Sequence, residues 1–276
     1  MVALHGGTGD RPTAARCERI RRHLCRILDR TYRYALTHSA LDTVVYGACL
    51  LEDDPLFNAG TGSALQRDGA ARMSASVMDG TPRRFAGVCN IERVRHPIQV
   101  AAALLNQPEH VLAGSHASRF ARTLGMTPWD PVTAARRRQW AHRLRGAHGT
   151  IGVVALDRDG RLAAGTSTGG RGFERPGRVS DSGMPAGNYA TDAVAISATG
   201  RGEDIVDEGL AVRIAQQVAD GRSVAEAVRR TVRELRQRTR QAGLIALDRA
   251  GRWTWATTLP ALFAVARSPQ GVSENF

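Results

Sequence analysis

The chain has 276 residues, of which 42% are hydrophobic and 23% charged, the composition of an ordinary globular protein. Its formal net charge is +12, but the basic residues are all arginine and scattered, and only 5% of residues are aromatic, which argues against specific nucleic-acid binding. No apolar run of about 18 residues is present, so no membrane span is predicted.

The cysteines and the N-terminus both point to a reducing compartment. The four cysteines are Cys17, Cys25, Cys49 and Cys89, too few and too widely spaced for a disulfide framework or a zinc site. The first residues, MVALHGG, lack the basic stretch and apolar core of a secretory signal. We therefore expect a cytoplasmic protein.

The first half of the chain alternates between strand and helix patterns. A short strand over 2–5 ends at a glycine pair, and helical periodicity follows over 12–37. Ser39 and Asp42 resemble a capping box that opens a second helix to about residue 53, where Pro55 stops it. Strands are then predicted over 63–67, 71–78 and 84–91, helices over 97–105 and 115–124, and an exposed connector over 126–149.

The pattern changes at residue 150. A strongly apolar strand over 150–157 and a return strand over 162–167 are separated by an Asp-Gly turn. A long loop over 169–188 precedes a buried strand over 193–198, helices over about 203–219 and 222–240, and a second hairpin near 244–252. Hairpin-paired strands flanked by helices predict an α+β fold of four layers, helix, sheet, sheet and helix, in one domain spanning 1–276.

Gly149 and Thr150 stand where the irregular connector meets the apolar strand. A threonine there can attack the preceding carbonyl, and the glycine tolerates a strained backbone. Cleavage would give Thr150 a free α-amine, which titrates near 8 and can act as the base for its own hydroxyl. A Gly-Thr pair alone is typical of any strand start, so the surroundings decide its weight.

Three further segments supply the chemistry that such a nucleophile needs. Residues 166–170 (TSTGG) follow one hairpin later, and antiparallel pairing would bring Thr168 beside Thr150. Arg178 and Asp181 lie three residues apart in the following loop. Thr199 and Gly200 close a strand onto a helix, where hydroxyl and amide groups can stabilise an oxyanion.

At this point the chain resembles the plant-type asparaginases and isoaspartyl peptidases, which are N-terminal nucleophile hydrolases of the threonine type. The resemblance covers nearly the whole chain. The motifs that carry it are HGG at 5–7, PLFNAGTG at 55–62, MDG at 78–80, GTIG at 149–152, TSTGG at 166–170, GRV at 177–179, DS at 181–182 and TG at 199–200.

The resemblance implies a role for each matching residue. Thr150 matches the nucleophile and Thr168 a threonine that positions it. Arg178 matches the clamp on the substrate α-carboxylate, for which a planar guanidinium is suited, and Asp181 matches the partner of the α-ammonium. The remaining matches are Thr199 and Gly200 for the oxyanion hole, Gly202 for the pocket lining, and Asn58 for a substrate-binding residue in the loop that approaches the nucleophile.

The resemblance also implies partners and processing. No cofactor is needed for the chemistry, but the 51–61 loop resembles one that holds a structural sodium ion through backbone carbonyls, here of Leu51, Glu52, Asp54, Phe57, Ala59 and Thr61. Self-cleavage would give fragments 1–149 and 150–276, two such units would form a dimer, and the partner in solution would be a small-molecule or dipeptide substrate rather than nucleic acid or membrane.

The chain departs from the family pattern around the substrate pocket. Ser180 stands where the family usually has glycine, and a serine would be strained if that position needed a positive φ. The following loop to Tyr189 is shorter by one residue, and residues 241–243 and 257–261 match the family poorly. Substrate choice and turnover therefore depend on how Asp181 is placed.

We predict an enzyme that hydrolyses β-aspartyl amide bonds of isoaspartyl dipeptides, L-asparagine or both. Two alternatives are an aspartylglucosaminidase-like or threonine-protease-like relative, and a binding protein that kept the fold but lost efficient catalysis. Cleavage of the Gly149–Thr150 bond would favour an enzyme, whereas a chain that stays intact would favour the binding protein.

Overall fold

The computed structural model describes residues 1–142 and 149–276, which form strands and helices in alternation along the chain. The strands are β1 Val2–Gly9, β2 Met73–Asp79, β3 Arg84–Ile91, β4 Val111–Ala113, β5 Ile151–Leu156, β6 Leu162–Thr168, β7 Asn188–Ala190, β8 Val194–Gly200, β9 Ala242–Asp248, β10 Trp253–Thr257, β11 Ala261–Ser268 and β12 Gly271–Asn275. The helices are α1 Ala14–Ala35, α2 Ala40–Glu52, α3 Pro97–Leu104, α4 Gly114–Thr123, α5 Ala134–Ala141, the 3₁₀ turn η1 Asp181–Gly183, α6 Gly202–Asp207, α7 Leu210–Ala219 and α8 Val224–Gln237.

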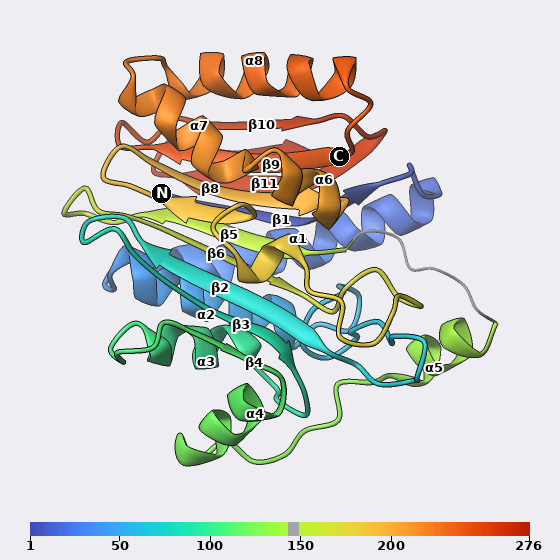
Figure 1. The fold of residues 1–276 in the computed structure, drawn as a ribbon. Helices are drawn as coiled ribbons and strands as arrows, with labels where there is room; N and C mark the ends of the chain where they lie inside the picture. Colours follow the sequence, from blue (N-terminus) through green and yellow to red (C-terminus); the bar gives the residue numbers. More distant parts are fainter. Residues whose placement is uncertain (143–148) are drawn as a thin grey trace.

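The strands of the described residues make two sheets. The larger has the order β12-β11-β1-β5-β6-β2-β3-β4, and the smaller has the order β10-β9-β8-β7. Figure 1 shows the smaller sheet stacked over the larger one, with α7 and α8 on its outer side and α1, α2 and α3 against the opposite face of the larger sheet. The predicted mixture of helix and sheet is confirmed.

Three apolar layers hold these elements together, and the central strands contribute to two of them. Val153 belongs to the core between the larger sheet and α1–α3, whereas its neighbour Val154 belongs to the core between the sheets. Val228 of α8 packs in a third core, between the smaller sheet and the helices α7 and α8. Because successive strand residues point to opposite faces, the continuous apolar run of β5 is what a strand buried on both sides requires.

Most predicted elements occur within a few residues of their expected positions. The Ser39 hydroxyl accepts a hydrogen bond from Asp42 N at 3.1 Å, as the predicted cap requires. The two hairpins, β5–β6 and β9–β10, are formed as expected. Pairing of Ile151 with Ser167 makes Thr168 the next residue opposite Thr150, so the predicted proximity of the two threonines is confirmed.

Several expected boundaries were wrong, each for a physical reason. Residues 63–67 are not a strand, because Leu65 O accepts from Phe173 N and Arg67 N donates to Glu174 O across an irregular loop. The single helix expected over 203–219 is two helices, since Gly209 adopts a left-handed conformation with φ 53° between α6 and α7. The 126–149 connector contains α5, an exposed helix. It has no apolar face, so its sequence shows no helical periodicity.

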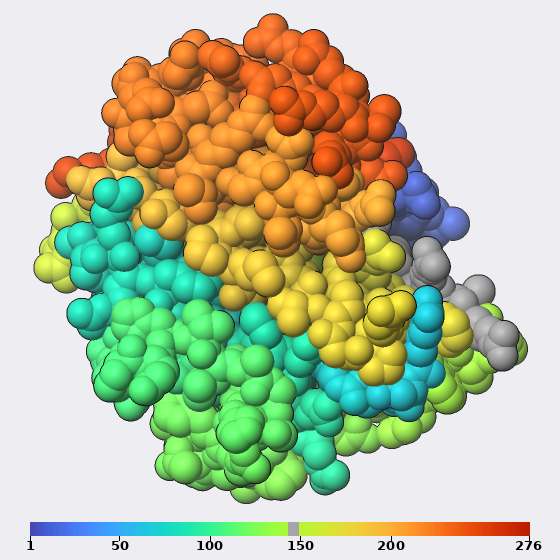
Figure 2. Space-filling view, in the orientation of Figure 1, coloured from blue at the N-terminus to red at the C-terminus, as the bar shows by residue number. Residues whose placement is uncertain are grey.

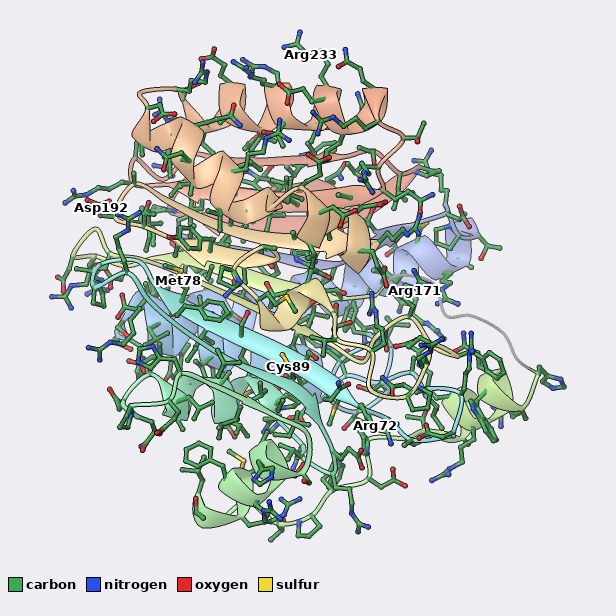
Figure 3. The ribbon with its side chains drawn as sticks, in the orientation of Figure 1. Arg72, Met78, Cys89, Arg171, Asp192 and Arg233 are labelled. Atoms are coloured by element: carbon green, nitrogen blue, oxygen red, sulfur yellow. The ribbon has the colours of Figure 1, made fainter. Side chains whose placement is uncertain are left out.

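The arginine-rich face of α8 points away from the protein. Val228, Val232 and Leu235 are buried beneath the helix, and Arg233 projects outward from it (Figure 3). Arg230 pairs with Glu234 one turn away. This is the solvated face expected from the sequence, while the absence of specific nucleic-acid binding stays a prediction.

Candidate functional site

Thr150 lies immediately before β5, at one end of the larger sheet. It is 7% exposed, and its hydroxyl donates to the Thr168 hydroxyl at 3.0 Å. Thr168 Oγ1 also accepts from Gly170 N at 3.2 Å, so its position is fixed from the loop that follows β6. The end of β6 therefore holds the hydroxyl of Thr150 through one hydrogen bond.

The carbonyl that Thr150 would attack is also held. Asn58 N donates to the carbonyl oxygen of Gly149 at 3.1 Å. A hydrogen bond to that oxygen polarises the carbonyl and would stabilise the negative charge that develops on it during attack. The loop bearing Asn58 thus acts on the Gly149–Thr150 bond through its backbone.

The Asn58 residue joins two loops through its hydrogen bonds. Its Nδ2 donates to the Gly170 carbonyl, its Oδ1 accepts from Ala64 N at 2.8 Å, and its own carbonyl accepts from Gly169 N at 2.8 Å. With these bonds made inside the protein, Asn58 serves to keep its amide aligned with Gly149. A substrate contact through the side chain, which the resemblance implied, stays a prediction.

The two sheets approach each other closely next to the nucleophile. A Cβ on Gly152 would lie 1.9 Å from Ser197 Oγ and 2.2 Å from His5 Nε2, so only glycine fits there. His5 Nε2 and Ser197 Oγ are 2.9 Å apart, and Ser197 Oγ is 2.6 Å from Thr166 Oγ1. Burial lowers the pKa of His5 to about 3, an effect that the nearby Thr150 backbone opposes. His5 is therefore a neutral member of a buried hydroxyl network.

This contact places Thr199 and Thr150 at the same end of two facing strands. Thr150 precedes Gly152 by two residues and Thr199 follows Ser197 by two, while β5 begins and β8 ends on the same side of the molecule (Figure 1). The period of two keeps each threonine on the facing side of its strand. Thr199 is fully buried, and its hydroxyl has no hydrogen-bond partner among the described residues. Its hydroxyl is therefore free to donate a hydrogen bond.

Gly200 has a backbone conformation that other residues rarely adopt. Its φ is 141°, and a Cβ there would lie 2.5 Å from the Gln241 carbonyl oxygen and 2.8 Å from Ala242 Cα. Arg201 N donates to the same Gln241 carbonyl at 2.9 Å. These close contacts fix the backbone conformation of Thr199 and Gly200 at the end of β8.

Three residues that the resemblance assigns to substrate binding lie close together: Arg178 in a loop, Asp181 at the start of η1, and Gly202 at the start of α6. A Cβ on Gly202 would lie 2.6 Å from Arg178 Nη2 and 2.8 Å from Asp181 Oδ1, so both charged groups border the space above this glycine. The two do not pair within 4 Å; instead Arg178 Nε donates to Glu203 Oε1 at 3.1 Å. A guanidinium and a carboxylate side by side match the α-carboxylate and α-ammonium of an amino acid.

The strain expected at Ser180 is absent. Its φ is −94° and ψ 160°, an extended conformation open to any residue, so the strain that a positive φ would have caused does not arise. Ser180 Oγ donates to Asp181 Oδ1 at 2.9 Å. Burial raises the pKa of Asp181 to about 6, although the Ser180 hydroxyl and the Arg178 charge both oppose that shift. Asp181 Oδ2 is buried without a partner in the described residues.

Sequence reasoning missed the residues that support this site. Glu203 bridges Arg178 and Arg171, which lies 3.2 Å from its other oxygen and is labelled in Figure 3. Glu52 accepts from Ser167 Oγ at 2.6 Å, directly beside Thr168, and burial raises its pKa to about 8. Figure 2 shows the loop after β6, in yellow, at the surface beside the cyan segment around residues 60–70. These partners lie far apart in sequence, so no local spacing indicates them.

The loop expected to hold sodium is tightly folded around Gly60 and Gly62. The position of a Cβ on Gly62 would lie 2.8 Å from the Pro55 carbonyl oxygen and 2.9 Å from that of Phe57, and a Cβ on Gly60 would lie 2.4 Å from that of Glu52. Among the described residues no hydrogen bond ends on the Phe57, Ala59 or Thr61 carbonyls, whereas Glu52 O accepts from Thr61 N at 2.7 Å. The free carbonyls are ligands of the type that a hard cation takes.

Residues 1–142 and 149–276 contain neither a candidate metal site of side chains nor a helix that could span a membrane. No group of three or more His, Cys, Asp or Glu side chains in these residues is arranged to hold a metal ion. None of their helices combines the length and apolarity needed to cross a membrane. The cytoplasmic location expected from the sequence stays a prediction.

Comparisons with known proteins give the family. The family model described as Asparaginase matches residues 1–147 and 142–275. An isoaspartyl peptidase/L-asparaginase of Synechocystis is 40% identical over 99% of this chain and 89% of its own length. An isoaspartyl peptidase of Escherichia coli is 37% identical over 91% of this chain and 87% of its own, and a plant-type L-asparaginase of Pyrobaculum calidifontis is 36% identical over 95% and 94%.

These matches identify the chain as a hydrolase. It belongs to the family of plant-type asparaginases and isoaspartyl peptidases, as the sequence motifs predict.

Proposed function

We propose that this protein is a self-processing threonine hydrolase that cleaves β-aspartyl amide bonds in isoaspartyl dipeptides, L-asparagine or both. The observation that carries the proposal is the pairing at residue 150: the Thr150 hydroxyl donates to Thr168, and the adjacent Gly149 carbonyl accepts from Asn58 N. A held hydroxyl beside a polarised carbonyl is the arrangement that intramolecular attack requires. The stacked sheets with helices outside support its assignment as the four-layer sandwich of N-terminal nucleophile hydrolases.

Self-processing proceeds by an acyl shift. Thr150 Oγ1 attacks the Gly149 carbonyl, the C–N bond breaks as the nitrogen takes a proton, and an ester links Gly149 to the threonine hydroxyl. Water hydrolyses that ester and leaves residues 1–149 and 150–276 as two subunits of one folded domain. Thr150 then carries an α-amine whose pKa near 8 suits it as a base at neutral pH.

Substrate hydrolysis reuses the same hydroxyl. Arg178 and Asp181 hold the α-carboxylate and α-ammonium of the aspartyl residue above Gly202, so its side-chain carbonyl reaches Thr150. The Thr150 hydroxyl attacks, its α-amine takes the proton, and the oxyanion is stabilised by the Thr199 hydroxyl and the Gly200 amide. The amine or ammonia departs with the proton, and water hydrolyses the β-aspartyl ester to release aspartate.

The altered loop at residue 180 was the best support for the alternative of an inactive binding protein. The extended backbone of Ser180 removes that support, since Asp181 is brought to Gly202 next to Arg178. The test of the proposed function is to incubate the purified chain, measure intact mass under denaturing conditions, and assay aspartate release from β-aspartyl-leucine and L-asparagine. We expect fragments 1–149 and 150–276 and aspartate release that rises with cleavage. A chain that stays whole and inactive would overturn the proposal.

Aspartate binding is expected to weaken in acid because of Asp181. Burial raises the pKa of this carboxyl from 3.8 to about 6, so it is ionised above pH 6 and protonated below. The neutral acid cannot pair with an α-ammonium, and the dissociation constant of L-aspartate should rise about tenfold per pH unit below 6. Titration calorimetry between pH 5 and 8 measures this. The Ser180→Ala variant loses the hydrogen bond that opposes the rise in the Asp181 pKa, so the pH below which the dissociation constant rises should be higher. The same pH in the variant and the parent would contradict this role of Ser180.

The 51–61 loop is proposed to hold a sodium ion through its carbonyls, those of Phe57, Ala59 and Thr61 being free of other partners in the described residues. The ion would stabilise the loop that carries Asn58 and would take no part in the chemistry. Because a ligand that binds only the folded state raises its stability, Tm should be higher in sodium chloride than in choline chloride of equal ionic strength. Equal Tm values would argue against the site. Association of two units into a dimer also stays a prediction.

A further inference from the structure

A cavity opens beside the candidate cleavage site. Its volume is about 720 Å³, within the range of small-molecule sites. Gly149 and Asn58 line its inner end, next to the nucleophile, while α1 and its preceding loop, α5 and Phe263 form its walls. Neither Arg178, Asp181 nor Gly202 belongs to this lining, so the cavity is separate from the space assigned to the aspartyl residue.

The cavity carries a surplus of positive charge. Arg11, Arg16, Arg19 and Arg136 line it, and none forms an ion pair with an acidic side chain of the described residues; the lining carboxylates are Asp10 and Asp54. Asp54 is already paired with His23, which lines the same cavity, at 2.5 Å. The undescribed residues 143–148 contain no aspartate or glutamate in their sequence.

The arginine at the α5 wall is held in place by neutral groups. Arg136 Nε donates to the Gly62 carbonyl at 2.5 Å and Nη1 to Gln139 Oε1 at 2.9 Å. Burial lowers its pKa, and the charge of Arg16 lowers it further. The Arg16 and Arg136 guanidinium groups line the same cavity and repel each other, and a bound anion would relieve that repulsion.

The walls beneath the arginines are apolar. Ile20, Phe57 and Phe263 line the cavity, and all are nearly fully buried. A ligand that combined a carboxylate with an apolar side chain would match both parts of this surface. Among the groups that the proposed reaction brings to Thr150, the amino acid released from an isoaspartyl dipeptide has this chemistry.

We propose that this cavity is the subsite for the leaving residue, which it recognises by that residue's free α-carboxylate. The inference rests on the proposed function. The scissile carbonyl carries two substituents, the aspartyl residue and the leaving amine. The aspartyl groups are taken by Arg178 and Asp181, so the leaving residue extends into the space that begins at Gly149 and Asn58. L-asparagine releases only ammonia and gains nothing from the cavity, so the enzyme discriminates in favour of dipeptides with a free C-terminus.

The experiment compares three substrates of the self-processed enzyme: β-aspartyl-leucine, β-aspartyl-leucinamide, which lacks only the leaving carboxylate, and L-asparagine. The variant is Arg16→Gln/Arg19→Gln, and the matched control is Arg22→Gln, on the same helix with 68% of its side chain exposed and outside the cavity. In the variant we expect kcat/KM for β-aspartyl-leucine to fall about tenfold, the loss of one charge-assisted contact. The other two substrates, and the control variant with all three, should change less than about twofold.

The outcomes separate the subsite from the function on which it rests. A parent enzyme that hydrolyses β-aspartyl-leucine and its amide with equal kcat/KM overturns the subsite alone, as does a variant that loses both activities equally. A parent that releases no aspartate from any substrate overturns the proposed function and the subsite with it. Self-cleavage of the variant reports that it has folded.

Discussion

Replacing Thr150 by alanine is expected to leave a single chain of 276 residues that releases no aspartate. The variant lacks the hydroxyl that attacks Gly149, so no ester forms and no α-amine is created. Loss of a nucleophile that serves in both reactions should lower activity by roughly 10⁴-fold or more. Intact mass after prolonged incubation, followed by an aspartate assay, measures both effects. The fold should persist, because the hydroxyl contacts only Thr168 among the described residues.

The matched control is Thr150→Ser, which keeps a hydroxyl but loses the methyl group that restricts rotation about the Cα–Cβ bond. It should still cleave, more slowly, because the hydroxyl is held less firmly towards Thr168. Fragments with the masses of residues 1–149 and 150–276 from the alanine variant would show that another group cleaves the chain. Such a result would remove the basis of the proposed mechanism.

The nucleophile could be predicted from sequence because its neighbours are local. The apolar run of β5, the Asp-Gly turn and the return strand fix the register of one hairpin, and that register alone brings Thr168 to Thr150. Arg178 and Asp181 are close in sequence as well. The distance from both to Gly202 could not be obtained from spacing, since it depends on how α6 folds back over η1.

The supporting residues were beyond such reasoning. Ser167 bonds to Glu52 from a strand more than a hundred residues away, and Asn58 reaches Gly149 across a similar interval. Each contact exists only once the sheets and helices have packed. The strand predicted over 63–67 was wrong for the same reason. The backbone of this segment forms hydrogen bonds with an irregular loop instead of a neighbouring strand, and a buried irregular segment has the same apolar pattern as a buried strand.

The last strands and the η1 loop show a second limit of prediction from sequence. β11 lies beside β1 in the larger sheet although it is almost the whole chain away, and no turn signal indicates that pairing. At Ser180 the family pattern suggested strain from a residue type, but strain depends on φ, which the sequence does not state. The observed extended backbone makes the serine a hydrogen-bond donor to Asp181 instead.

Replacing Arg178 by alanine is expected to separate the two reactions of this protein. Self-cleavage should persist, because the Gly149–Thr150 bond presents no α-carboxylate to a clamp. For L-asparagine, kcat/KM should fall roughly 10²–10³-fold, as expected when one partner of a hydrogen-bonded charge pair is removed. Most of the loss should appear in KM if Arg178 holds the α-carboxylate equally in the ground and transition states. Steady-state kinetics on the cleaved variant measure the division.

The matched control is Arg171→Ala, since Arg171 also contacts Glu203 but does not border Gly202. Both variants leave Glu203 with one arginine fewer, and its side chain is 45% exposed, so neither leaves a buried unpaired charge. A loss confined to Arg178→Ala therefore belongs to the carboxylate clamp. The same substitution removes a charge that lowers the pKa of Asp181, so the acid limit of aspartate binding should move to higher pH. Kinetics equal to those of the parent would rule out the clamp, and equal losses in both variants would assign the effect to Glu203.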